Sequence, residues 1–178
     1  MKNILLKTIA AVLLVGTGYA GPIHTSASKG DLAGVQAQLD IGVDVNAKGS
    51  LGESPLHKAA KMGRKDMVQL RIDKGADLNA KEDEGLTPLD WAIKRGRTAT
   101  ADLLRKHGGK YSTIHTPAMI GDIETVKELL ADGANVNAKD EFGKTPLDRA
   151  IKYQRTETAD LLRKHGGKTS EELKAEGK

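Results

Sequence analysis

Residues 52–81 contain the stretch that decides the fold: G-E-S-P-L-H-K-A-A-K-M-G-R-K-D-M-V-Q-L-R-I-D-K-G-A-D-L-N-A-K. Parts of it recur along the chain at one fixed period. Asn46-Ala47-Lys48 returns as Asn79-Ala80-Lys81, and Ser54-Pro55-Leu56 returns as Thr87-Pro88-Leu89, in both cases 33 residues later. A fixed period of this length indicates an array of identical supersecondary units.

Each repeat reads as two short helices joined by a turn. Ser54 can cap the free amides of a first helix, and Pro55 suits its first position, where no amide hydrogen is needed. Gly63 is the expected left-handed stop. A second helix follows, with apolar positions at Met67, Val68, Leu70 and Ile72. Such a helix pair cannot bury its apolar face alone, so stacked neighbours must cover it.

Ser54-Pro55-Leu56-His57-Lys58-Ala59 at this period resembles the T-P-L-H-x-A signature of the ankyrin-repeat family. The resemblance covers about residues 23–168. It implies an all-α ankyrin-repeat solenoid of stacked helix-turn-helix units with short β-hairpin fingers between them. About five repeats are expected, at 23–48, 49–81, 82–110, 111–139 and 140–168.

The two ends of the chain read differently from the array. Residues 1–20 combine Lys2 and Lys7 with a short apolar run and the small residues Gly18 and Ala20, which is typical of a signal peptide cleaved near Ala20. The alternative is an uncleaved anchor, although the run is shorter than the ~20 residues of a membrane span. The sequence therefore predicts an exported bacterial-type protein, periplasmic or secreted. Residues 169–178 form a polar tail or a capping helix.

The array is interrupted after its third repeat. Residues 103–110 end in a helix stop without the expected finger, and His115 then opens a repeat that resembles the first one. Thr87 to Lys110 and Thr145 to Lys168 match closely, 58 residues apart. A duplicated block of two repeats explains both observations.

Two residues depart from the family pattern. Arg71 stands where the other repeats have Leu104, Leu129 and Leu162. Pro117 falls inside a first helix, where a proline would break a backbone hydrogen bond. We expect that helix to begin late, with Thr116 as its cap and Pro117 as its first residue.

Composition and motifs argue against catalysis. The chain has no cysteine, 3% aromatic residues and a formal net charge of +4. His24, His57 and His115 occupy the family's motif position, where the resemblance implies hydrogen bonds within and between repeats. No metal-ligand spacing, phosphate-binding glycine loop or nucleophile motif occurs. We therefore predict no catalytic residue, no metal and no cofactor.

The remaining candidate for a functional site is a binding surface. In ankyrin arrays the exposed face of each first helix and the finger tips line a concave groove, and this face carries basic and aromatic side chains here. We predict that it binds the partner through Lys58, Lys61, Trp91, Lys94, Arg95, Met119, Arg149, Lys152 and Tyr153. One interpretation is that the lysines and arginines are ordinary helix formers on a solvated face. The sharper interpretation is a groove for an acidic protein segment.

The predicted function is a non-catalytic protein–protein interaction module, expected to be a monomer without a membrane span after signal cleavage. Binding of nucleic acid or another polyanion through the basic groove is the alternative, although the small net charge and the export signal argue against nucleic acid. An enzyme with an unrecognised site is the third possibility. Equivalent positions in stacked repeats lie side by side, so we expect Trp91 to be an exposed anchor whose removal barely alters folding.

Overall fold

The computed structural model describes residues 22–177 and divides the chain into two compact units, the first ending at Ser112 and the second beginning at Thr113. The predicted signal peptide lies outside the described residues. Within 22–177, no helix has both the length and the apolar character needed to cross a bilayer.

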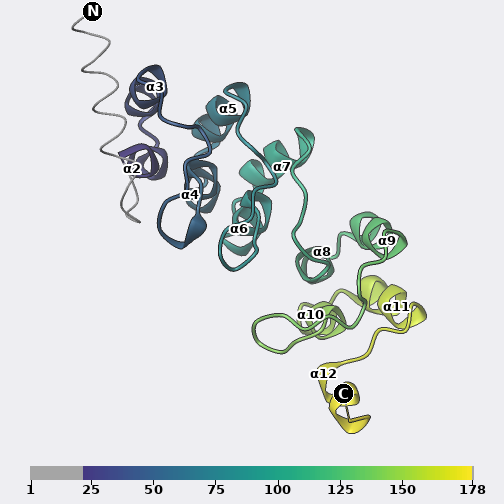
Figure 1. The fold of residues 1–178 in the computed structure, drawn as a ribbon. Coiled ribbons are helices and arrows are strands. Elements are labelled where there is room, and N and C mark those ends of the chain that lie inside the picture. The colour runs from purple at the N-terminus through teal and green to yellow at the C-terminus, as the bar shows by residue number, and fades with distance from the viewer. Residues whose placement is uncertain (1–21, 178) are drawn as a thin grey trace, which may run out of the picture. The chain divides into compact units, whose positions relative to one another are not determined.

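The first unit, residues 22–112, consists of three stacked helix pairs (Figure 1). The first helices α2, α4 and α6 pack in one row, and the second helices α3, α5 and α7 pack in another. Their bounds are α2 Pro22–Lys29, α3 Leu32–Asp40, α4 Pro55–Met62, α5 Lys65–Asp73, α6 Pro88–Lys94 and α7 Thr98–Lys106.

The second unit, residues 113–177, contains two helix pairs and a final helix. Helix α8 packs on α10, and α9 packs on α11. The bounds are α8 His115–Ile120, α9 Ile123–Ala131, α10 Pro146–Lys152, α11 Thr156–Lys164 and α12 Ser170–Ala175. The five helix pairs agree with the predicted ankyrin solenoid, and α12 occupies the segment where the sequence left a tail or a capping helix open.

The first helices begin where the Ser/Thr-Pro signal places them. Helices α4, α6 and α10 start at Pro55, Pro88 and Pro146, and the hydroxyl before each proline accepts an amide hydrogen from the third helical residue. Helix α4 ends at Gly63, whose φ of 70° is the predicted left-handed stop.

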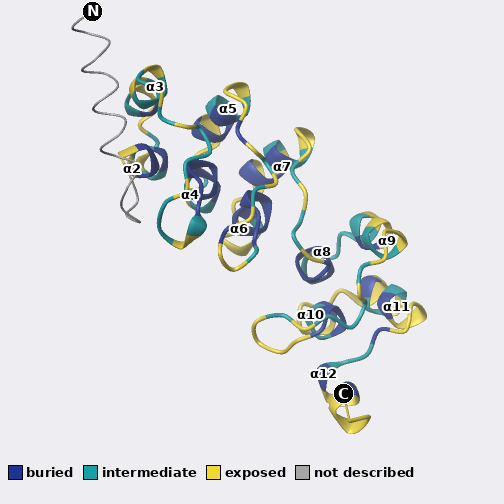
Figure 2. Ribbon diagram, viewed as in Figure 1, coloured by how far each residue is buried: buried dark blue, intermediate teal, exposed yellow. Residues whose placement is uncertain are grey.

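The apolar faces meet between neighbouring pairs, as the sequence predicts. Alanines of the first helices let these helices approach closely, and leucines of both rows fill the space between them. Figure 2 shows buried residues gathered on α4, which has a helix pair on each side, whereas α12 exposes most of its surface. The buried apolar residues at the centre of the first unit include Leu56, Ala59, Ala60, Leu89 and Ala92.

The connections between repeats are tight turns, not the β-hairpin fingers that we expected, since residues 22–177 contain no strand. We call the segment before each Ser/Thr-Pro helix start a finger loop. A backbone hydrogen bond closes each of these loops. The amide of Glu82 donates to the carbonyl of Leu86 at 3.2 Å, and the amide of Asp140 donates to Lys144 at 3.0 Å. The loop 49–53 contains a short 3-10 turn over Ser50–Gly52. These spans are too short for paired strands.

We expected the first helix of the fourth repeat, α8, to begin late, and this prediction is wrong. Helix α8 begins at His115, two residues before Pro117, and Ile114 is its cap position without a side-chain cap. Pro117 is nevertheless tolerated, because the first four amides of a helix have no partner within the helix. The carbonyl of Pro117 also accepts the hydrogen bond that ends the helix at Gly121.

The histidines at the motif position tie each first helix to the finger loop of the next repeat. His57 Nε2 lies 3.1 Å from the carbonyl of Leu86, and its Nδ1 accepts the amide of Ser54 at 3.1 Å. His24 and His115 reach finger-loop carbonyls in the same way. This confirms the structural role that the family resemblance implied for these histidines.

Aspartate replaces histidine at the same position in the last full repeat of each unit. Asp90 Oδ2 accepts the amide of Ser112 at 2.8 Å, and Asp148 Oδ2 accepts that of Ser170 at 3.0 Å. A neutral imidazole N–H donates to carbonyls, whereas a carboxylate accepts from amides. Histidine therefore marks a repeat that is followed by a finger loop, and aspartate marks the closing segment of a unit.

Sequence reasoning missed a second link between repeats. Arg97 lies across the end of the preceding first helix, where its Nε donates to the carbonyl of Lys61 at 3.4 Å and its Cδ packs over Gly63. A Cβ at Gly63 would come within 2.8 Å of that Cδ, so glycine is needed there for space as well as for its φ. Arg155 repeats this arrangement over Gly121 in the second unit.

Arg71 is fully buried in α5, as its alignment with leucines indicated. One guanidinium nitrogen donates to the carbonyl of Val45 at 3.3 Å, while Nε and Nη2 have no hydrogen-bond partner. Burial lowers the pKa of Arg71 to about 10. The protein thus carries a poorly satisfied cation among the apolar residues of its second helices.

We predict that Arg71→Leu raises the free energy of unfolding by about 1 kcal/mol, because leucine fills the site without a buried charge. Since the folded pKa is depressed, wild-type Arg71 releases its proton more readily in the folded state than in the unfolded chain. Wild-type stability should therefore recover as pH rises through about 10, and the advantage of the variant should shrink. Urea unfolding of both proteins at neutral and alkaline pH measures this, and a less stable variant would contradict the account.

Candidate functional site

The predicted binding residues fall into two sets, one in each unit. Lys58 and Lys61 project from α4, and Trp91 and Lys94 belong to α6, which Arg95 terminates. In the second unit the set consists of Met119, Arg149, Lys152 and Tyr153. That both sets line one continuous groove stays a prediction.

Trp91 is not the exposed anchor that we expected. Its side chain is only 9% exposed. Three cationic groups cover the ring: Lys61 Nζ lies 3.8 Å from the ring centroid, Lys94 Nζ lies at 5.1 Å and the Arg95 guanidinium carbon lies at 5.4 Å. We call these four residues the Trp91 cage. One of the cations comes from the neighbouring repeat, so the alignment of single repeats gave no sign of the burial.

The ring fixes the positions of the three cations. A cation over an aromatic face gains about 0.5–2 kcal/mol, depending on how far it is desolvated. The indole Nε1 is buried without a hydrogen-bond partner, so the ring is held by its faces and not by its polar atom. Lys94 and Arg95 are nevertheless exposed residues.

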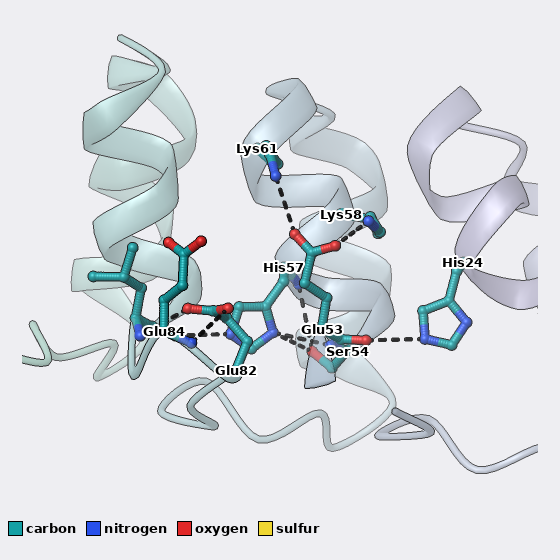
Figure 3. Close-up of polar contacts among 9 residues, drawn as sticks. His24, Glu53, Ser54, His57, Lys58, Lys61, Glu82 and Glu84 are labelled. Carbon is teal, nitrogen blue, oxygen red and sulfur yellow. Dashed lines mark hydrogen bonds and ion pairs between the residues drawn. The ribbon is translucent and has the colours of Figure 1, made fainter. Parts of the chain in front are cut away.

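Glu53 is the residue that sequence reasoning missed in the first unit. Figure 3 shows its carboxylate between Lys58 and Lys61, with Oε1 3.1 Å from Lys61 Nζ and Oε2 paired to Lys58. The Glu53 side chain is 1% exposed. Burial acts to raise the pKa of Glu53, but the hydrogen bonds from the two lysines outweigh it and the pKa is lowered. A buried acidic residue therefore lies among the basic residues of this face.

The sequence before α4 contained an indication of the contact between Glu53 and the two lysines, and we did not use it. Glu53 directly precedes the Ser54-Pro55 helix start, and its backbone carbonyl accepts from His24 Nε2 at 3.1 Å. The histidine link therefore holds the loop against α4, which brings the carboxylate to the lysines of that helix (Figure 3). A carboxylate just before a helix start and cations in its following turns would have indicated the contact.

In the second unit a similar carboxylate neutralises Arg149. Asp140 of the finger loop lies 2.7 Å from Arg149 Nε and 2.5 Å from its Nη2, and both side chains are largely buried. The Arg149 guanidinium also lies 5.5 Å from the centroid of Phe142. Burial acts to raise the pKa of Asp140, but hydrogen bonds from Lys144, Arg149 and Phe142 lower it overall. Asp140 was also missed from sequence.

The other predicted residues of the second unit have fewer such contacts. Tyr153 is 42% exposed, and Lys152 Nζ lies 5.6 Å from its ring centroid. The Met119 side chain is partly buried, and its carbonyl accepts from Arg155 Nε at 3.2 Å. The structure therefore keeps Lys152 and Tyr153 at the surface of the first helices.

Exposed apolar side chains accompany these cations. Leu51 and Phe142 stand at finger tips with exposed fractions of 64% and 69%, and Met62 ends α4. Apolar tips beside a charged helix face are typical of a surface that contacts another macromolecule. By contrast, the described residues bring no three His, Asp or Glu side chains together in a way that could hold a metal ion.

We predict that Trp91→Ala lowers the free energy of unfolding by about 3 kcal/mol, because a nearly buried aromatic ring leaves a cavity under the cations. Trp91→Phe should cost much less, since it keeps a ring and the lost indole N–H has no partner. Tyr153→Ala, at an exposed position, is the matched control. Urea unfolding followed by circular dichroism measures all three, and an unchanged stability of Trp91→Ala would restore the exposed-anchor interpretation.

Comparison with known proteins identifies the architecture. A family model described as ankyrin repeats (3 copies) matches residues 23–114 and again residues 109–172. The serine/threonine-protein kinase VIK of Arabidopsis thaliana is 40% identical over 58 residues, which are 33% of this chain and 13% of that protein. Cyclin-dependent kinase 4 inhibitor B of Rattus norvegicus is 37% identical over 59 residues, 33% of this chain and 45% of the inhibitor.

The chain covers less than half the length of both curated relatives, and each match covers a third of this chain. They support the repeat and carry no activity over to it. The family model, in contrast, covers most of the chain in two matches that overlap at residues 109–114, where the first unit gives way to the second. With its stacked helix pairs and Ser/Thr-Pro helix starts, the chain belongs to the ankyrin-repeat family.

Proposed function

We propose that this chain is a non-catalytic protein-binding module that is exported from the cell and engages an acidic segment of its partner. Ankyrin repeats generally mediate protein–protein interaction. The single observation that carries the proposal is the convergence of Lys61, Lys94 and Arg95 on Trp91. Aromatic and arginine side chains are enriched among residues that dominate binding energy.

The polar groups of the first helices support a binding role over a catalytic one. His57, the most enclosed of the histidines, has both ring nitrogens engaged in hydrogen bonds that link repeats. Burial lowers its pKa, so the ring stays neutral as a structural donor. A histidine that acts as a general base needs a ring nitrogen within hydrogen-bond reach of the proton that it removes from the substrate.

Charge favours a protein partner over nucleic acid. Glu53 already balances part of the charge of Lys58 and Lys61, and Asp140 balances Arg149. Nucleic-acid affinity comes mainly from many cations that contact successive phosphates. A face with isolated clusters of cations is better suited to individual acidic side chains of a protein.

A photo-crosslinking residue placed at Met62, beside the cage, should capture a partner from an envelope extract. The same residue at Lys74, after the second helix α5, should capture none, because that side of the repeat lies in the other helix row. Crosslinked products are identified by mass spectrometry. Equal capture at the two positions would contradict binding through the first helices.

Export is proposed from the amino-terminal sequence, with Lys2 and Lys7 before an apolar run and Gly18-Tyr19-Ala20 after it. We predict that the exported protein begins at or near Gly21. Intact-mass measurement of the protein from the envelope fraction checks this. Recovery of the full chain from Met1 in the soluble cytosol would contradict it.

A further inference from the structure

The contact between the first and second repeats contains most of the buried polar atoms that lack a hydrogen bond. Within residues 22–177, seven buried side-chain nitrogen or oxygen atoms have no hydrogen-bond partner. Four of the seven belong to His24, Gln38 and Arg71, which lie in α2, α3 and α5. Such atoms are rare in proteins, and a group of them at one contact is typical of a place that holds an ion or a water molecule.

Gln38 and Arg71 occupy equivalent positions of neighbouring repeats, 33 residues apart, and the third repeat has Leu104 there. Helix α3 packs on α5, so stacking brings these equivalent positions next to each other. Leu104 is fully buried, as expected for this row of the second helices. Two polar side chains thus stand side by side in a row that is otherwise apolar.

The guanidinium of Arg71 uses only one of its nitrogens within the chain. Nη1 donates to the carbonyl of Val45 at 3.3 Å, in the turn that leads out of the first repeat. The charged end of Arg71 therefore points toward the repeat that contains Gln38. Nε and Nη2 are buried and have no partner. The N–H groups of Nε and Nη2 are nearly parallel, and this edge of a guanidinium binds an anion through two hydrogen bonds.

The charge of Arg71 is not balanced by the groups that surround it. Arg71 is fully buried, and burial is the cause that lowers its pKa. The pKa of His24 is lowered first by burial, and the charges that lower it further are the cations Lys58 and Arg71. A buried charge is costly and is normally paired with an opposite one. An anion at this contact would supply the missing negative charge.

We propose that Arg71 binds a small monovalent anion, of the size of chloride, between α3 and α5. Nε and Nη2 of Arg71 donate to the anion, and the side-chain amide of Gln38 supplies a further N–H donor. A half-turn of that amide exchanges its oxygen and nitrogen, so Nε2 takes the place of the unpartnered Oε1. The site is separate from the protein-binding surface proposed above and does not rest on it.

The enclosure of Arg71 decides which anion fits. Its side chain is fully buried, so a peptide carboxylate or a nucleic-acid phosphate would have to separate the two repeats in order to reach it. A water molecule would accept the same two hydrogen bonds, but it would leave the charge of Arg71 unbalanced. A small free anion meets the requirements of hydrogen bonding, charge and size together.

The test is urea unfolding of the mature protein in sodium chloride and in sodium gluconate at equal ionic strength, because gluconate is too large for an enclosed site. Wild-type stability should rise saturably as chloride replaces gluconate. At a chloride concentration of ten times the Kd, the unfolding equilibrium constant should fall about elevenfold. Arg71→Leu, which we expect to be more stable than the wild type, should lack this saturable gain and sets the baseline for general salt effects. Its advantage should therefore shrink in chloride.

Two further variants locate the effect. Gln38→Leu should weaken the affinity for chloride several-fold, because it removes one donor from the site. Arg97→Gln, which removes an exposed arginine of the same unit, is the matched control and should keep the full response. A wild type that gains no more from chloride than Arg71→Leu would overturn the proposal and would favour a water molecule at these atoms. A saturable gain that persists in Arg71→Leu would also overturn it, because the anion would then bind elsewhere.

Discussion

The structure depends on one hydrogen bond in each repeat. It joins the side chain at the histidine position of the first helix, as at His57, to the segment that follows that repeat. A helix pair of this size cannot cover its own apolar face, so each pair must be held in register with the next one. His57 does this from α4 by donating to the carbonyl of Leu86 in the next finger loop. Where Asp90 and Asp148 take that position, the bond goes to the amides of Ser112 and Ser170, and a unit closes. One position thus links every first helix to the segment that follows its own repeat.

The same link shapes the candidate binding surface. Because His24 holds the carbonyl of Glu53, the carboxylate of that residue meets the lysines of α4 at the surface (Figure 3). This contact orients Lys61, which then covers Trp91 of the next repeat. The cage is consequently a product of stacking, since its members come from two repeats. If the two repeats lost their register, Lys61 would separate from the ring of Trp91.

Much of the fold could be predicted from the sequence, because helix starts, helix stops and apolar spacing are local signals. The starts at Pro55 and Pro88, the stop at Gly63 and the burial of Arg71 follow from positions within one repeat. The burial of Trp91 could not be predicted in this way, because its cover comes from the neighbouring helix. Glu53 and Asp140 were missed because they lie in loops, where the aligned positions differ in residue type. Pro117 was placed wrongly because the first turn of a helix tolerates proline at more than one position.

The central claim is that recognition lies on the first helices of the first unit and not on their duplicated counterparts. The most direct test is a map of backbone amide chemical shifts during titration of the mature protein with hexaglutamate. The account predicts that shifts concentrate at residues 58–62 and 91–95, around the Trp91 cage, and that residues 149–153 stay nearly unchanged. Equal or larger shifts at 149–153 would contradict it, because the carboxylate of Asp140 already occupies Arg149 there.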